Sequence, residues 1–483
     1  MEKTPALLVL SLSVACACSA GEDPGGDGNT TEQPKKWQDE FSLSIPPDLN
    51  ADPHILEVDI EARLEELEIV PGVLTEMWTY NGTVPGPLLR ASVGDRVIVH
   101  FTNHLAEPTT VHWHGLRVPA AMDGTVAVQD PVQPGETFTY DFTLLDAGTY
   151  WYHPHLHSSA QLGYGLYAPI VVDDPDDPVS AEDVVIVLSD LALDEAGQLD
   201  PDDKSGWFGD FFGQEGELLL VNGKLEPTLR VRPGLPQRWR IINAARSRFY
   251  GLAVPGAKVD RIAGDAGLSE HPLSIEQLVL HPSERSELLV TVNETDTSTI
   301  TVLSQDVNRF EIGLTAGDLP LFHLDLNEPA TSAPAPLPAE LRHFEDLHLE
   351  GLATREIELS ETEDGGLAIN GVVFTETEEA HHEGAHTAAH VGYVGDTEIW
   401  EVNNTTEFAH PFHLHGFPFQ VLDVGGQPWP VREWKDTANI PPGQLLRFVV
   451  NYDDRPGLWM FHCHILGHAN LGMMSTLDIR PAL

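Results

Sequence analysis

Close to its C-terminus the chain reads Trp459-Met460-Phe461-His462-Cys463-His464-Ile465-Leu466-Gly467-His468, and then Ala469-Asn470-Leu471-Gly472-Met473-Met474. One thiol is flanked by two imidazoles, a third imidazole follows five residues after the thiol, and a thioether follows ten residues after it. On a strand, successive side chains point to opposite faces. His462 and His464 would then serve one site, and Cys463 would serve another together with His468 and Met473.

The donors around Cys463 match one kind of metal site. A thiolate, imidazoles and a weak axial thioether are the ligands of a blue-copper electron-transfer site. His468 supplies one imidazole only, so the second imidazole has to come from elsewhere in the chain.

Length and charge limit what the protein can be. With 483 residues the chain is too long for one core, and about two to four domains are expected. It has 26 basic and 75 acidic residues, which gives a formal net charge of −49. Such a charge repels nucleic acid and anionic membrane surfaces and attracts cations, so no nucleic-acid partner is expected.

The N-terminus resembles an export signal. Residues 1–20 contain an apolar run too short to span a bilayer, followed by small residues. Ser13–Cys16 loosely resembles a lipoprotein box, so a lipid anchor at Cys16 and plain cleavage a few residues later both stay open. Residues 21–40 predict a flexible tether. We expect a monomer without a transmembrane span, in the periplasm or outside the cell.

Cysteine usage points to the same stretch as the metal-ligand pattern. Of the three cysteines, Cys16 and Cys18 belong to the signal region, so Cys463 is the lone thiol of the folded chain. An exported protein without an internal disulfide has another use for such a cysteine. A small buried apolar role is common for single cysteines, but the two flanking histidines make it a poor explanation here.

From Phe41 the chain consists of short alternating apolar runs separated by Gly, Pro, Asn and Asp, for example 96–101, 137–142 and 184–188. This density of short strands and turns indicates an all-β protein built of sandwiches or barrels.

Two turn signals recur at the spacing of one domain. The first is an Asn-Gly pair, found at Asn81-Gly82, Asn222-Gly223 and Asn370-Gly371. The second comes later in each unit, as Pro134-Gly135-Glu136, Pro282-Ser283-Glu284 and Pro442-Gly443-Gln444. The pattern predicts three copies of one β-domain, at 41–176, 177–327 and 344–483, with a linker rich in Pro and Ala at 328–343.

Four histidine motifs carry the chemistry. They are His112-Trp113-His114, Trp151-Tyr152-His153-Pro154-His155, His410-Pro411-Phe412-His413-Leu414-His415 and His462-Cys463-His464. On a strand, His-x-His puts both imidazoles on one face, as a shared metal cluster requires. The middle unit has Asn243-Ala244-Ala245-Arg246 where the first has its first motif. One pair alone is weak evidence, but four pairs together with the only thiol make chance a poor explanation.

These motifs resemble those of the multicopper oxidase family, and the resemblance covers nearly the whole mature chain. It implies three cupredoxin-like Greek-key domains and four copper ions, one of type 1, one of type 2 and two of type 3. By motif, the type 1 ion would be held by His410, Cys463, His468 and an axial Met473, which the spacing from the cysteine favours over Met474. The other ligands would be His112 and His413 for type 2, and His114, His153, His155, His415, His462 and His464 for type 3.

The resemblance also implies an oxidase that uses O2. A small reducing substrate would give up one electron near His410 or His468, whose ring edges are expected to face the surface. The electron would pass from Cys463 along the backbone to His462 and His464, where the cluster reduces O2 to water.

Oxygen reduction consumes protons, and Asp123 lies where the resemblance places a carboxylate near the type 2 copper. It is therefore the candidate proton relay, although an ordinary Asp-Gly surface turn explains it equally well. Many bacterial relatives carry a further acid directly after the last type 1 histidine. Here that residue is Ala469, so a second relay acid, if one exists, has to come from elsewhere. We interpret His157 as solvated or as a neighbour of the ligands.

The substrate is less well determined than the class of reaction. Phenols and aromatic amines, as in laccases, are the first prediction, and Cu(I), Fe(II) or Mn(II) is the alternative. Family members that oxidise Cu(I) usually have methionine-rich segments, but the six methionines here do not cluster outside the terminal motif. A structural cupredoxin-fold protein without oxidase activity is the remote alternative, and the complete ligand set argues against it.

One further segment could bear on metal substrates. A run rich in His and Glu can bind metal ions, although a solvated insertion is the favoured interpretation. The run comprises Glu376, Glu378, Glu379, His381, His382, Glu383, His386 and His390.

Overall fold

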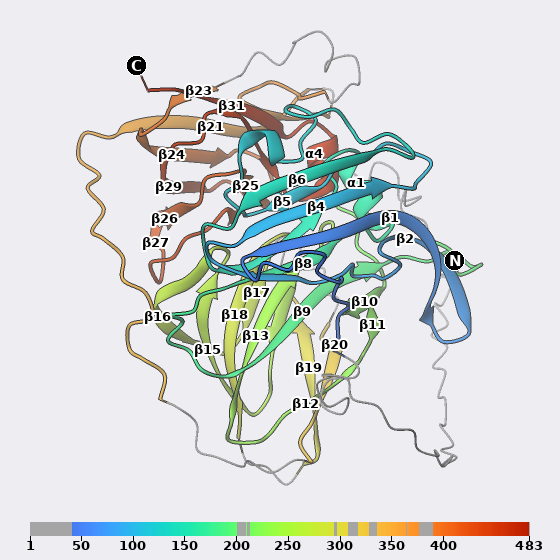
Figure 1. Ribbon diagram of the computed structural model, residues 1–483. Helices are drawn as coiled ribbons and strands as arrows, with labels where there is room; N and C mark the ends of the chain where they lie inside the picture. The colour runs from blue at the N-terminus through green and yellow to red at the C-terminus, as the bar shows by residue number, and fades with distance from the viewer. Residues whose placement is uncertain are drawn as a thin grey trace, which may run out of the picture. The chain divides into compact units, whose positions relative to one another are not determined.

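Figure 1 shows the computed structural model, which describes residues 41–199, 209, 213–293, 297–307, 317–327, 336–363, 365–375 and 390–482. These residues belong to one compact unit. The signal region, the tether and most of the His- and Glu-rich segment lie outside the described residues. Within the described part, no helix is long and apolar enough to cross a membrane.

The first segment, residues 55–173, contains two four-stranded sheets. One sheet has the order β2-β1-β4-β6, formed by β1 (Ile55–Val70), β2 (Val73–Tyr80), β4 (Arg96–Asn103) and β6 (Thr137–Thr143). The other has the order β3-β8-β7-β5, formed by β3 (Leu89–Ser92), β5 (His112–His114), β7 (Gly148–His153) and β8 (Ala168–Asp173).

The middle segment, residues 182–325, contains a seven-stranded and a five-stranded sheet. The larger has the order β11-β10-β9-β13-β18-β15-β16, formed by β9 (Glu182–Leu191), β10 (Leu218–Val221), β11 (Lys224–Leu225), β13 (Pro236–Asn243), β15 (Ala257–Gly264), β16 (Gly267–Ile275) and β18 (Arg285–Val292). The smaller has the order β12-β20-β19-β14-β17, formed by β12 (Thr228–Arg230), β14 (Tyr250–Ala253), β17 (Leu278–Leu280), β19 (Thr299–Gln305) and β20 (Leu319–Asp325).

The third segment, residues 353–480, contains a six-stranded and a five-stranded sheet. The larger has the order β22-β21-β24-β29-β26-β27, formed by β21 (Ala353–Glu361), β22 (Leu367–Ile369), β24 (Thr397–Asn404), β26 (Phe419–Val424), β27 (Gln427–Pro428) and β29 (Leu445–Asn451). The smaller has the order β23-β31-β30-β25-β28, formed by β23 (His390–Tyr393), β25 (His410–Leu414), β28 (Thr437–Ile440), β30 (Gly457–Cys463) and β31 (Met474–Arg480).

One strand order occurs in all three segments. β1, β9 and β21 run parallel to β4, β13 and β24 respectively. On their other side, β4, β13 and β24 pair antiparallel with β6, β18 and β29 respectively. All three Asn-Gly pairs have positive φ at both residues, as a two-residue hairpin turn requires. The domain boundaries at 176 and between 327 and 344 stay a prediction.

Each segment packs its own apolar core, and each core contains a fully buried tryptophan, Trp113, Trp239 or Trp400. Replacing such a side chain by alanine costs about 3–5 kcal/mol. The core of the third segment also contains Cys463 and Met473. The thiol therefore points into the core of its own sandwich, as the predicted alternation requires.

Short helices complete the described structure. They are η1 (Ala120–Met122), α1 (Ser158–Gly163) and α4 (Leu466–Asn470). α1 follows the second histidine motif and α4 carries His468, and the two helices contact each other.

Candidate metal centres

Two antiparallel strand pairs bring the predicted ligands together. β5 and β7 place His112 directly opposite His153, and β25 and β30 place His413 opposite His462. Directly opposed residues have Cβ atoms about 5 Å apart, so the register alone gathers the imidazoles in pairs. All eight histidines predicted for the trinuclear site are buried: His112, His114, His153, His155, His413, His415, His462 and His464.

His112 and His413, the two predicted type 2 ligands, each present one free ring nitrogen. The Nδ1–H of His112 donates to the Asp123 carbonyl (2.7 Å), and the Nδ1–H of His413 donates to the Asp436 carbonyl (2.9 Å). Both Nε2 atoms are buried without a hydrogen-bond partner. Fixing one ring nitrogen by a backbone carbonyl leaves the other for a metal, so these two residues fit a copper ion.

His155, His415 and His462 form one group of three. The Nε2 atom of His462 lies 3.3 Å from that of His155 and 3.2 Å from that of His415. The Nδ1–H of His462 donates to the Cys463 carbonyl (2.9 Å), and that of His415 donates to Asp123 Oδ2 (2.9 Å). The free nitrogens thus converge on one point, as the three donors of one metal ion would.

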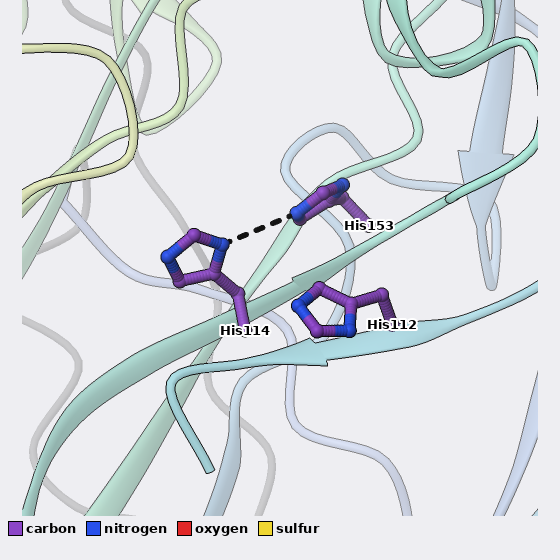
Figure 2. A group of neighbouring side chains, drawn as sticks. All are labelled: His112, His114 and His153. Carbon is purple, nitrogen blue, oxygen red and sulfur yellow. Dashed lines mark hydrogen bonds between the residues drawn. The ribbon is translucent and has the colours of Figure 1, made fainter. Parts of the chain in front are cut away.

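His114, His153 and His464 form a second group of three. His153 Nε2 lies 3.5 Å from His114 Nδ1. Figure 2 shows these two rings facing each other, with His112 beside them. The His464 ring centroid lies 5.0 Å from that of His114 and 5.4 Å from that of His153. Both ring nitrogens of His464 are buried without a hydrogen-bond partner. Because an unsatisfied buried polar group is costly, the arrangement fits a ligand that binds a metal.

Burial keeps these imidazoles neutral. Desolvation, together with repulsion from neighbouring imidazoles, lowers the pKa of His155 to about 3 and lowers the pKa of His153, His462 and His464 well below the usual range. Metal binding requires the neutral form of histidine, so the site holds its donors in the form that binds copper.

The thiol site is separate from the histidine groups. Cys463 Sγ lies 3.6 Å from His468 Nδ1, which lies 3.1 Å from His410 Nδ1. Met473 belongs to the same buried core as Cys463, whereas Met474 packs in another cluster with Met460. The structure brings together the donors of a blue-copper site, and the packing favours Met473 as the axial residue.

The expectation that the His410 or His468 ring faces the surface is wrong. The two residues are 0% and 1% exposed. Thr406 Oγ1 lies 2.7 Å from His410 Nε2, and its own proton goes to Asn404 Oδ1 (2.8 Å). The hydroxyl therefore accepts from His410 Nε2–H and covers the ring edge that was expected to be open.

Asp123 is no surface residue, although it does follow the short helix η1. It is 1% exposed, and its carboxylate accepts from His415 Nδ1 and lies 3.5 Å from His112 Nδ1. Burial alone would raise the pKa of Asp123, but attraction to His415 and His112 outweighs it and holds the pKa well below the usual range. The turn interpretation therefore does not account for this residue.

Sequence reasoning missed a second buried carboxylate at the histidines. Asp436 accepts from His114 Nε2 (3.1 Å) and lies 3.5 Å from His413 Nδ1. It precedes β28, whose first residue Thr437 pairs with His413. No motif marks Asp436 in the sequence, because its position depends on which strand pairs with β25. Ala469 is buried and packs near Met474, and the prediction that a second relay acid, if one exists, comes from elsewhere stays a prediction.

Two other histidine predictions have different outcomes. His157 is exposed at the start of α1 and lies outside the ligand groups of the described residues, in line with a solvated role. His390 begins β23 and is half-buried, with its ring 5.4 Å from Phe461, so it does not belong to a solvated insertion. Residues 376–389 lie outside the described residues.

Comparison with known proteins gives the same family for three ranges that together cover most of the chain. Residues 62–177, 182–318 and 365–482 each match a multicopper oxidase profile. Multicopper oxidase MmcO of Mycobacterium tuberculosis is 31% identical over 452 residues, covering 84% of both chains. The laccase of Bacillus subtilis is 27% identical and covers 84% of this chain and 90% of its own.

Solved structures agree with these sequence matches. A multicopper oxidase from Campylobacter jejuni, described as a metallo-oxidase, superimposes with a TM-score of 0.81 at 30% identity, covering 91% of this chain and 94% of its own. The predicted all-β fold with cupredoxin-like domains is confirmed, and the clustered histidines fit copper sites. The chain therefore belongs to the multicopper oxidase family.

Proposed function

We propose that this copper-dependent oxidoreductase is laccase-like and couples one-electron oxidation of phenols or aromatic amines to the four-electron reduction of O2 to water. One observation carries the proposal. In His462-Cys463-His464 the thiol lies with His410 and His468. His462 faces His155 and His415, and His464 lies beside His114 and His153. The residue that would pass electrons on and two residues that would hold the oxygen site are thus consecutive in the chain, where β30 ends at Cys463.

Four copper ions would be held by the predicted ligands. The type 1 ion would bind His410, Cys463, His468 and Met473, the type 2 ion His112 and His413, and the type 3 pair the two groups of three histidines described above. When bound, copper accepts single electrons and carries the reduction of O2. The protein fixes the ring tautomers, excludes water and supplies protons.

The chain's own residues set the path of electrons and protons. Cys463 is joined to His462 and His464 by single peptide units, so the covalent route between the sites is short. Asp123 Oδ2, which accepts from His415 Nδ1 (2.9 Å), is the atom at which we place a proton relay. It lies at the trinuclear histidines and not at the thiol, where no proton is consumed.

We prefer phenols to Cu(I) as the substrate because the chain has few thioether side chains that could bind Cu(I). Thioether-rich segments bind Cu(I), but the chain has only six methionines. Met473 and Met474 both lie in the terminal motif, and Met460 is buried. A phenol needs no such donors, because it delivers its electron by contact with the protein surface over the type 1 site.

A second candidate, oxidation of Fe(II) or Mn(II), is favoured by one specific observation. The loop that carries Thr406, the residue hydrogen-bonded to His410, also carries the exposed Glu407. Thr405 of the same loop donates its N–H to the Leu359 carbonyl (3.0 Å) of β21, the strand that ends at Glu361. Burial and repulsion from the Glu407 carboxylate raise the pKa of Glu361. Two exposed carboxylates, one of them next to the residue that bonds to His410, on a chain of net charge −49, suit hard divalent cations.

Steady-state kinetics of the copper-loaded protein separates the two candidates. A phenol, Cu(I), Fe(II) and Mn(II) are compared in parallel for the wild type and for Glu361→Gln/Glu407→Gln. A laccase-like enzyme oxidises the phenol with the highest kcat/KM and keeps that value in the double variant. A loss confined to Fe(II) or Mn(II), with the metal ion preferred in the wild type, would replace the first candidate by the second.

A further inference from the structure

The middle segment provides none of the proposed copper ligands, yet one of its turns contacts them indirectly. The turn 282–285 leads into β18, and its residues Ser283 and Arg285 are fully buried. Both contact residues at the start of β28, the strand that pairs with the ligand strand β25.

Arg285 holds Asp436 with both branches of its guanidinium. Its Nη1 donates to Asp436 Oδ1 (2.7 Å) and its Nη2 donates to Asp436 Oδ2. The guanidinium also donates from Nε to the Thr149 carbonyl (3.0 Å) and from Nη2 to the Asp265 carbonyl (2.9 Å). A two-pronged guanidinium–carboxylate pair fixes the plane of the carboxylate as well as its position.

The position of Asp436 decides which nitrogen of His114 is free. Its Oδ1 accepts from His114 Nε2–H (3.1 Å), which leaves His114 Nδ1 facing His153. His112 and His413 are held the opposite way, through Nδ1 on backbone carbonyls. His114 therefore depends on a side chain for its tautomer, and that side chain is oriented by Arg285.

Ser283 acts on the same carboxylate from a second direction. Thr437 donates its hydroxyl proton to Asp436 Oδ1 (2.9 Å), so Ser283 Oγ–H donates to Thr437 Oγ1 (3.1 Å). Thr437 Oγ1 also lies 3.2 Å from His413 Nδ1. The chain of hydrogen bonds from Ser283 thus ends at both His413 and Asp436.

The backbone at Ser283 shows that a simpler residue would fit the turn better. Gly135 and Gly443 precede β6 and β29, the counterparts of β18, and have φ of 82° and 64°. Ser283 has φ of 71°, a region that glycine adopts freely and other residues adopt at a cost. A Cβ at either glycine would meet open space, whereas the Ser283 hydroxyl meets Thr437.

We propose that the turn 282–285 of the middle segment is a positioning element for the trinuclear copper site. Arg285 and Ser283 orient Asp436 and Thr437, which in turn fix the rings of His114 and His413. The inference rests on the proposed ligand roles of these two histidines. It assigns a function at the copper cluster to the segment that has no copper ligands of its own.

The test compares Arg285→Lys with Arg238→Lys. Arg238 is a matched control, because it is buried in the same segment and its guanidinium bonds to Glu287 and Asp177. Copper content, the electron paramagnetic resonance of type 2 copper and the visible type 1 band are measured for each. We expect Arg285→Lys to weaken type 2 and type 3 copper binding by about 10- to 100-fold with the type 1 band unchanged, and Arg238→Lys to leave all three signals as in the wild type.

If Arg285→Lys does not fold, Ser283→Gly tests the inference in its place, because glycine readily adopts the backbone conformation of this turn. We expect it to fold fully, keep the type 1 band and shift the type 2 resonance. Wild-type resonance parameters and four coppers in both foldable variants would overturn the inference, as would a loss of type 1 and type 2 signals in equal proportion. Failure of the proposed ligand set is distinguishable, since the wild type itself would then lack a type 2 signal.

Discussion

The backbone N–H of Cys463 donates to the carbonyl of Met473 (3.1 Å). This bond ties the return of the chain after α4 to the end of β30, and both side chains enter the core of the third segment. Met474 is the next residue and points to a different cluster with Met460. Two adjacent thioethers are therefore distinguished by the apolar cluster in which each is buried.

This arrangement predicts that two neighbouring substitutions affect the reduction potential of the type 1 copper differently. Met473→Leu removes the weak axial donor, which destabilises Cu(II) relative to Cu(I) and raises the reduction potential of the type 1 copper. Met474→Leu conserves the volume of its site and leaves the potential nearly unchanged. Redox titration of both variants checks the assignment, and a shift in the Met474 variant alone would identify the other sulfur as the ligand.

Cys463→Ser tests the thiolate itself. Serine keeps the size of the side chain but removes the sulfur donor, so the intense visible charge-transfer band and the oxidation of every substrate are expected to disappear. The histidine groups contact one another without Cys463, so type 2 and type 3 copper stay bound. An absorption spectrum with copper analysis measures both effects, and a blue Cys463→Ser protein would refute the type 1 assignment.

Thr406 provides a test of how His410 is held. Thr406→Val removes the acceptor for His410 Nε2–H (2.7 Å), whereas Thr406→Ser keeps the hydroxyl. Loss of such a partner typically costs about 10- to 100-fold in metal affinity. Copper titration followed at the visible band should show this loss for valine only; equal affinities in the two variants would mean that the hydroxyl does not orient the ring.

Local patterns were enough to predict much of the fold and of the ligand set. The alternation in His462-Cys463-His464 predicted that the thiol and the imidazoles face different sites, because strand geometry has a period of two residues. The structure separates them in this way, although β30 ends at Cys463 and His464 follows directly after it. The Asn-Gly pairs predicted tight turns because positive φ is needed at both positions. These features depend on neighbours in the sequence, so a single sequence reveals them.

Contacts between distant segments could not be predicted in this way. Asp436 meets His114 only because the third segment packs against the first, and Arg285 reaches Asp436 from the middle segment. The burial of His410 was missed for the same reason, since the Thr406 hydroxyl reaches the ring through the fold of a loop. The partner of a charged residue that belongs to no motif cannot be predicted until the strand pairing is known.

Asp123 gives the prediction that bears most directly on the oxygen reaction. Its carboxylate accepts from His415 Nδ1 (2.9 Å), and its backbone carbonyl accepts from His112 Nδ1 (2.7 Å). Asp123→Asn keeps the backbone contact and the shape of the side chain but cannot take up and release a proton in the same way. Copper content, the blue band and reduction of type 1 copper by substrate should therefore match the wild type.

Reoxidation by O2 is the step that should slow in Asp123→Asn. Loss of a positioned acid or base typically costs about 10²- to 10⁴-fold in rate, and a fall of that size in reoxidation alone would locate the relay at this carboxylate. Stopped-flow reoxidation of the fully reduced protein measures it, with Asp123→Glu as the control that retains a carboxylate. If the asparagine variant with all its copper reoxidises at the wild-type rate, Asp123 orients His415 and takes no part in proton transfer.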